Sequence, residues 1–148
     1  DLVGRKLGAS SGKYIMNFIN EVKTFVEHNA KNETFEIDFA TPLKSAVHDL
    51  EKSLDYFLKH GITDPNNALA GASDFLHLFG HVILGYLWSR IGKKSLVHLS
   101  LKHNVDFYEA KLITGKFYMK RTLPETKLRL ARILSGKTSV MDLNDEMF

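Results

Sequence analysis

ALAGASDFLHLFGHVILGYLW, residues 68–88, is the stretch that decides the fold of this 148-residue chain. It is apolar on nearly every side of a helix, and its acidic and histidine side chains are limited to Asp74, His77 and His81. Its length would suit a bilayer, which requires about 20 apolar residues. Each ionisable group at mid-membrane costs roughly 2.5 kcal/mol or more, however, so we predict no membrane span. We instead expect the central helix of a bundle, with part of its surface facing a partner.

A metal site is the second reading of this stretch. Asp74, His77 and His81 follow one another at i, i+3 and i+7, on one face of a helix. Di-iron bundles need an acid-x-x-His motif on two helices, and the chain has only one copy. The zinc motif HExxH also fails, because Leu78 stands where the glutamate belongs. We therefore predict packed, hydrogen-bonded histidines and no metal, and the roles of His77 and His81 stay open.

Apolar residues also recur at helical spacing before and after this stretch. They predict four helices, which span approximately residues 12–30, 41–60, 64–96 and 104–136. The strand pattern of period two is missing from the sequence. Long amphipathic helices joined by short loops favour an all-α fold, an antiparallel up-down four-helix bundle.

The helix ends have their own sequence signals. Thr41-Pro42 and Asp64-Pro65 each place a capping side chain before a proline, which is typical of a helix start. Ser10 or Ser11 is expected to cap the first helix, and Gly61 to follow the end of the second. The polar residues 29–38 are predicted to form a loop or a frayed turn.

The fourth helix is interrupted by Pro124. Its ring removes a hydrogen bond and crowds the preceding turn, so we predict that the helix is kinked or broken near this residue, with Thr122 able to cap a restart. We expect one broad apolar side of the fourth helix to be buried, comprising Phe107, Ala110, Leu112, Ile113, Phe117, Tyr118 and Met119.

Composition narrows the class of protein. Hydrophobic residues make up 44% and charged residues 25% of the chain, as in ordinary globular proteins. The sequence has no cysteine, which excludes a disulfide framework, a thiol nucleophile and a cysteine zinc site, and it shows no signal or transit pattern. These features predict a cytoplasmic protein. Because the sequence opens with Asp1, we expect it to be a piece of a longer protein.

The net charge of +3 is unevenly distributed. Residues 90–137 hold twelve lysines and arginines against three acids, a net charge of +9. Such a region can meet the phosphates of nucleic acid or of coenzyme A. Lysines spaced along a helix more often form its solvated face, so we predict no nucleic-acid partner. The sequence contains no signature of a catalytic triad or a nucleophile elbow, and we predict no catalytic residue in this chain.

Four segments resemble one enzyme family. Residues 1–8, DLVGRKLG, resemble the segment that follows the catalytic region of acyl-CoA dehydrogenases. Residues 66–90, 106–126 and 136–143 resemble the extra C-terminal domain of a larger subgroup, which includes the 3-methylmercaptopropionyl-CoA dehydrogenase type. The resemblance implies that residues 1–11 are the tail of the preceding dehydrogenase helical domain and that residues 12–148 are the appended helical bundle.

The resemblance also implies a function for the parent protein. Members oxidise an acyl-CoA to the 2,3-enoyl-CoA, with FAD taking a hydride and a glutamate removing the α-proton. In the family that glutamate precedes the segment that Asp1 opens, so no catalytic or cofactor-binding residue carries over and no FAD is expected in this fragment. The implied partners are the rest of the dehydrogenase chain, acyl-CoA, an electron acceptor and further copies in a homo-oligomer.

The fragment itself would then serve packing, oligomerisation or shaping of the substrate entrance. Lys111, Lys116, Lys120 and Arg121 are our candidates for contact with CoA phosphates, since lysine acts as a point charge for phosphate. The alternative is a stand-alone helical binding or adaptor bundle without enzymatic activity.

Overall fold

The computed structural model describes Val3 and residues 12–30, 33–61, 63–143 and 145–147. Every regular element in these residues is helical and none is a strand, which confirms the predicted all-α class. The five longest helices are α2 (Lys13–Asn29), α4 (Thr41–Tyr56), α5 (Pro65–Ser100), α6 (Val105–Phe117) and α7 (Glu125–Leu134).

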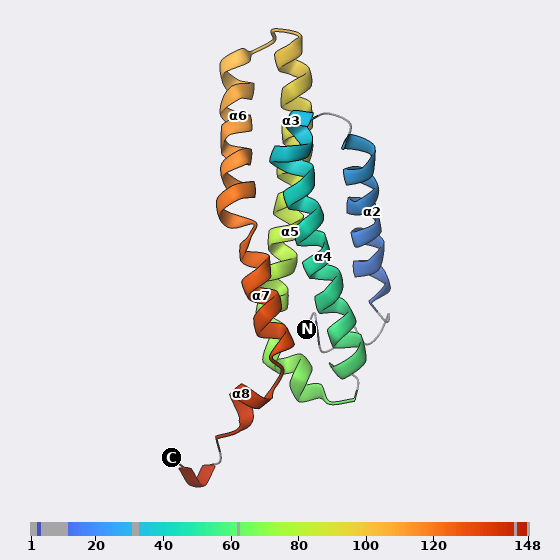
Figure 1. Ribbon diagram of the computed structural model, residues 1–148, viewed down its shortest axis with the longest axis vertical. Helices are drawn as coiled ribbons and strands as arrows, with labels where there is room; N and C mark the ends of the chain where they lie inside the picture. Colours follow the sequence, from blue (N-terminus) through green and yellow to red (C-terminus); the bar gives the residue numbers. More distant parts are fainter. Residues whose placement is uncertain (1–2, 4–11, 31–32, 62, 144, 148) are drawn as a thin grey trace.

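The 36-residue helix α5 organises the molecule. It runs along nearly the whole long axis, with α6 and α7 following one another beside it (Figure 1). The α4 helix packs against α5 and α7, α2 packs against α4, and the short α8 (Thr138–Met141) leads away from the bundle. The up-down four-helix bundle, as a regular arrangement, stays a prediction.

The α5 helix is central but not fully enclosed. Phe75, Leu78 and Val82 on one side are completely buried in the core. By length and composition α5 could also cross a membrane, and a third of its most apolar window is buried inside the protein. A core helix of a soluble protein passes the same test, so the absence of a membrane span stays a prediction.

The prediction of a loop over residues 29–38 is wrong for the part that the structure describes beyond Ala30. Residues 33–40 form α3 (Glu33–Phe35) and the π-helical turn η2 (Glu36–Ala40), which continues directly into α4. Phe35 and Phe39 are four residues apart and both buried, and their burial stabilises this helical entry. Thr41 therefore lies inside a continuous helix and caps nothing, contrary to our prediction.

A wide turn precedes both prolines that lie within the helical segments. The Thr41 N–H donates to the Glu36 carbonyl, five residues back, and the Leu123 N–H donates in the same way to Tyr118 at 2.9 Å. A proline ring clashes with the carbonyl four residues earlier in a regular α-helix, and such a wide turn relieves that crowding. The change in helix geometry near Pro124 thus begins at Tyr118, in η4 (Tyr118–Thr122), and α7 starts at Glu125. The kink itself stays a prediction.

The start of α5 is as predicted. The Asp64 side chain accepts a hydrogen bond from the Asn66 N–H at 3.1 Å, and Pro65 is the first helical residue. The helix ends at Ser100, four residues beyond the predicted end. Ser10 and Ser11, the predicted caps of the first helix, lie outside the described residues.

The predicted burial of one side of α6 is mostly wrong. Phe107, Ile113 and Phe117 are 49%, 70% and 62% exposed, and only Met119 of the predicted set is buried. The α6 helix packs against the C-terminal half of α5, and no described element covers its opposite side. Phe107, Ile113 and Phe117 therefore point away from the core, whereas Leu112 is partly buried against it.

Candidate functional site

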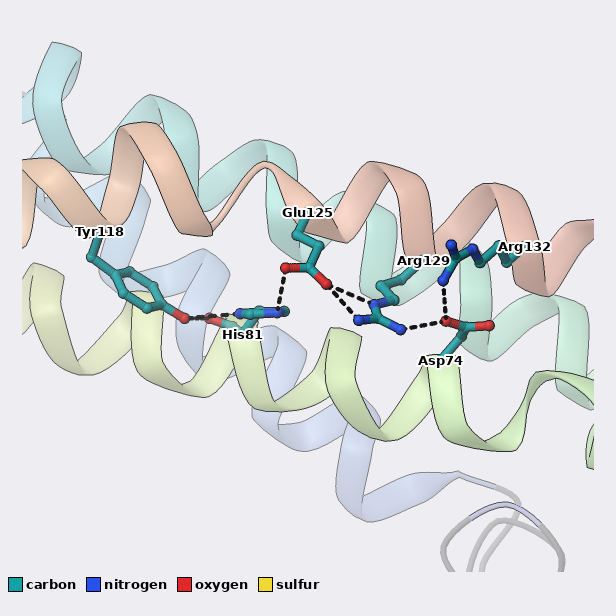
Figure 2. Close-up of polar contacts among 6 residues, drawn as sticks. All are labelled: Asp74, His81, Tyr118, Glu125, Arg129 and Arg132. Carbon is teal, nitrogen blue, oxygen red and sulfur yellow. Dashed lines mark hydrogen bonds and ion pairs between the residues drawn. The ribbon is translucent and has the colours of Figure 1, made fainter.

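A row of polar side chains joins α5 to η4 and α7, and we call it the interhelical polar row (Figure 2). Each member contacts the next through a hydrogen bond or an ion pair. Its members are Asp74, His81, Tyr118, Glu125, Arg129 and Arg132.

Arg129 links the two acids of the row. Its Nη1 donates to Asp74 Oδ1 at 2.8 Å, and its Nε donates to Glu125 Oε1 at 3.0 Å. The hydrogen bond from Arg129 holds the pKa of Glu125 below its usual value. The two acids in turn raise the pKa of Arg129, Asp74 more than Glu125. Glu125 and Arg129 are therefore both charged at neutral pH.

His81 connects Glu125 to a tyrosine on η4. The Tyr118 hydroxyl lies 3.2 Å from His81 Nδ1 and donates to the His81 carbonyl oxygen at 3.3 Å. His81 Nε2 lies 3.5 Å from Glu125 Oε2. Burial, and secondly the negative charge of Glu125, raise the pKa of Tyr118 to about 12. Tyr118 is therefore a neutral phenol at physiological pH.

The interhelical polar row holds helices together and has no free reactive group. Each acid and base points at another member, as Figure 2 shows. A buried hydrogen bond from Thr126 Oγ1 to Asp49 Oδ2, at 2.8 Å, ties α7 to α4 in the same manner. Within the described residues, no group of three or more His, Cys, Asp or Glu side chains is placed to hold a metal ion. His77 is exposed, and only His81 joins the row.

Two of the four predicted phosphate contacts share one acid. Lys116 Nζ lies 2.7 Å and Lys120 Nζ lies 3.3 Å from the carboxylate oxygens of Asp38, on η2. Burial acts to raise the pKa of Asp38, but the hydrogen bonds and charges of the two lysines outweigh it and hold the pKa below its usual value. The Asp38 carboxylate therefore neutralises part of the positive charge of Lys116, on α6, and Lys120, on η4.

The other two predicted residues lie apart from that pair. Lys111 Nζ sits 5.2 Å from the ring centroid of Phe107, a cation–π contact. Arg121 is exposed and makes no ion pair with any described residue. The four cations thus include one pair on a shared acid and two separate side chains, and their contact with phosphate stays a prediction.

An open groove of about 770 Å³ lies between α2 and α4. Its charged lining residues include three acids and three basic or potentially basic groups, namely Glu27, Glu36, Glu51, Lys23, Lys44 and His48. Lys23 already pairs with Glu51 at 2.6 Å. No member of the interhelical polar row lines this groove, so the groove and the row are separate features.

Sequence reasoning missed the partners that make these contacts. Asp38 lay in the segment predicted as a loop, although Phe35 and Phe39 at i and i+4 signal a helix there. Arg129 was counted only as one of many positive charges. Its pairing with Asp74 depends on which faces of α5 and α7 meet, and helical spacing within one segment does not reveal that.

Comparison with known proteins identifies one family. The family described as acetyl-CoA dehydrogenase C-terminal like matches residues 18–144, which cover most of α2 and all of α4 to α8. A search of curated proteins finds no significant match.

Proposed function

This chain belongs to the acetyl-CoA dehydrogenase C-terminal-like family, and on that premise we propose that it is the C-terminal accessory domain of an FAD-dependent acyl-CoA dehydrogenase. The family match over residues 18–144 is the observation that carries the proposal. We propose that the parent protein oxidises an acyl-CoA to the 2,3-enoyl-CoA and is of the 3-methylmercaptopropionyl-CoA dehydrogenase type. The domain itself would be an up-down helical bundle without catalytic residues.

The flavin would bind outside this chain. A flavin dinucleotide carries a diphosphate, which proteins bind with unpaired cations or with helix N-termini. The groove between α2 and α4 holds as many acids as basic groups, and its Lys23 is engaged by Glu51. The residues of this groove therefore do not fit the cofactor, and we assign no step of the oxidation to this chain.

Packing or assembly is the role that the surface supports. The charged side chains of the interhelical polar row pair with one another between helices. Large apolar side chains such as Ile113 and Phe117, by contrast, remain exposed on α6. Exposed apolar side chains in such number are typical of a surface that meets another protein part. We therefore propose that the domain packs on the rest of the dehydrogenase or on another subunit.

The contact with CoA phosphates is a further part of this proposal. Of the four candidates, Arg121 is the most available, because Lys116 and Lys120 face Asp38 and Lys111 lies over Phe107. In the parent enzyme, charge reversal of Lys120 and Arg121 should raise the KM for acyl-CoA. An unchanged KM would exclude this role and leave the packing role intact.

The deciding experiment compares this chain with the longer protein encoded by its gene. We expect calorimetry of the purified chain to give no heat with FAD, and the longer protein to bind FAD and reduce an acceptor dye when acyl-CoA is added. Saturable acyl-CoA binding by the chain alone would extend the proposal, because the domain would then form part of the substrate site. A reading frame that starts at this chain, with no dehydrogenase region before it, would overturn the proposal in favour of an adaptor bundle.

A further inference from the structure

The C-terminal segment of the chain leaves the bundle. We call residues 138–147 the acidic arm, which contains α8 and the short η5 (Asp145–Met147). Figure 1 shows the arm leading away from the end of α7, clear of the other helices. Its sequence has three acids, Asp142, Asp145 and Glu146, and no basic residue. Asp142 and Glu146 are exposed and pair with no described cation, so their charge is available to a basic surface.

The acidic arm also exposes apolar side chains. Four of them are more than half exposed: Val140 at 64%, Met141 at 58%, Leu143 at 57% and Met147 at 70%. The α8 helix has four residues, and none of them is buried. An isolated helix shorter than about 12 residues is only marginally stable in water. Such a short helix therefore needs a surface to pack on, and no described part of its own chain buries it.

The root of the acidic arm is fixed to the bundle. The backbone N–H of Lys137 donates to Asn67 Oδ1 at 3.1 Å, and its Nζ pairs with Asp64 at the start of α5. Gly136, just before it, has a φ of +67°, and a Cβ there would lie 2.9 Å from the Tyr56 hydroxyl oxygen. Only glycine suits both this backbone conformation and this close approach. The fold therefore sets the point and the direction in which the arm leaves the bundle.

A surface of the opposite charge lies on α6, η4 and α7. Residues 111–132 hold seven lysines and arginines against one acid, Glu125, a net charge of +6. Ion pairs within the chain neutralise part of this charge. Arg121 and Lys127, however, are exposed and pair with no described acid. Their positive charge therefore complements the negative charge of the acidic arm.

The same surface is apolar between its cations. Phe117 and Leu128 each lie between buried positions two residues before and two residues after them. Two residues correspond to roughly half a helical turn, so both side chains point away from the core. Ile113 on α6 is 70% exposed, Phe117 is 62% exposed and Leu128 on α7 is 51% exposed. We call this surface the basic outer face, and its members are Ile113, Phe117, Arg121, Lys127 and Leu128.

A second copy of this chain is the occupant that these charges favour. An acidic segment is repelled by anionic lipids and by nucleic acid, so a basic protein surface suits it best. The arm and α6 of one copy lie at opposite ends of the long axis (Figure 1). A twofold axis across the long axis turns the second copy end over end, which brings the α6–α7 side of each copy toward the arm of the other. Every contact is then made twice.

We propose that the acidic arm of one copy docks on the basic outer face of a second copy, and reciprocally, in a twofold dimer. The apolar side chains of the arm pack against Phe117 and Leu128 of the other copy, and the acids of the arm face Arg121 and Lys127. The proposal names the partner for the packing role and rests on the proposed function only for its place in the dehydrogenase. Its test measures association and needs no enzymatic activity, so each can fail without the other.

Sedimentation equilibrium of the purified chain tests the proposal directly. The wild-type chain is expected to show a reversible monomer–dimer equilibrium, and a chain that stops at Lys137 to be monomeric throughout. Because no residue of α8 is buried, this deletion should leave the circular dichroism spectrum and the Tm of the monomer unchanged. The wild-type dimer should weaken as salt is raised to about 0.5 M, because salt screens exposed charges.

Charge reversal identifies the two surfaces. Lys127→Glu on the basic outer face and Asp142→Lys on the arm should each weaken the dimer by about tenfold, because each places like charges across both copies of the contact. The two changes in one chain should restore association, because opposite charges then meet again. Lys52→Glu is the matched control, since it makes the same change at an exposed position on α4. Lys127 is not a candidate for CoA phosphates, so this result is independent of the KM test.

A fluorescent peptide of residues 137–148 measures the docking step by itself. By fluorescence anisotropy, it should bind the chain that lacks the arm and should bind the same chain carrying Lys127→Glu about tenfold more weakly. Three results would overturn the proposal. The first is a wild-type chain that is monomeric at every concentration, since a peptide that still binds would then show that the arm folds onto its own copy. The second is a dimer that survives deletion of the arm, and the third is equal loss of association in Lys127→Glu and Lys52→Glu.

Discussion

Replacing Gly92 with alanine should destabilise this protein, although alanine is the better helix former. A Cβ at Gly92 would lie 2.8 Å from Phe39 Cζ and 3.0 Å from two other atoms of that ring. The ring has no space to retreat: it is 1% exposed, stacks on Phe35 at 5.4 Å, and lies 3.0 Å from the Cβ position of Gly115 on α6. The added methyl group must therefore push α5 and α6 apart or distort the ring.

The magnitude follows from two opposing effects. Overpacking of a filled core costs about 1–3 kcal/mol. Alanine recovers about 1 kcal/mol of helix propensity relative to glycine. We expect a net loss of about 1 kcal/mol in the free energy of unfolding, or about 2–4 °C in Tm for a chain of this size.

Chemical denaturation monitored by circular dichroism measures this loss, and Gly80→Ala is the matched control on the same helix. With no described atom within 4 Å of its Cβ position, Gly80→Ala should stabilise the monomer by about 1 kcal/mol when measured at a concentration too low for association. Adding Phe39→Leu to Gly92→Ala should cost less than the two single changes together, because the ring that clashes is gone. A Gly92→Ala variant as stable as the wild type would refute the reasoning.

Three further predictions concern the charged contacts. The pKa of Asp38 is lowered in the folded protein, so the ionised carboxylate stabilises the fold. This stabilisation is fully present above the unfolded pKa and is lost as the pH falls through the folded pKa. Asp38→Asn should therefore flatten the decline of Tm below about pH 4. Arg129→Met should lower the free energy of unfolding in urea more than Arg132→Met does, because Arg129 donates to both Asp74 and Glu125, whereas Arg132 lies 3.7 Å from Asp74 and is largely exposed; equal losses would contradict the geometry. Ultraviolet titration should show one tyrosine ionising near pH 12, and Tyr118→Phe should remove that step.

A local signal in the sequence predicted the start of α5, which depends on neighbouring residues alone. Asp64 and Pro65 begin α5 as expected, since the cap needs only a carboxylate and a backbone N–H two residues later. The same signal wrongly predicted a helix start at Thr41-Pro42, because the π-helical turn before these residues lets the helix continue without a break across Pro42. A threonine followed by a proline therefore marks a helix start only where the preceding residues are not themselves helical, and here buried Phe35 and Phe39 keep them helical.

The candidate site could be predicted only in part, because its contacts depend on how the helices meet. The positive charge of residues 90–137 is visible in the sequence. The pairing of Lys116 and Lys120 with Asp38 is not, since each lysine is about 80 positions from Asp38 and meets it only when η2 packs beside η4. For the same reason the exposure of α6 was missed: an apolar face predicts burial against something, but periodicity does not say whether the covering surface belongs to the same chain.

The α5 helix is apolar on nearly all sides because it has two apolar faces, one toward the core and one exposed. A helix with a single buried face shows apolar residues on one side and polar residues on the other. In α5 the core face of Phe75 and Leu78 and the outer face of Leu76 and Leu84 lie on opposite sides, so the sequence is apolar all round and resembles a membrane span. Asp74 and His81 fit between these faces because the interhelical polar row gives each a partner on α7 or η4. A substitution that makes only the outer face polar should therefore leave the fold intact and change only what the chain binds, whereas a polar residue at Leu78 should unfold it.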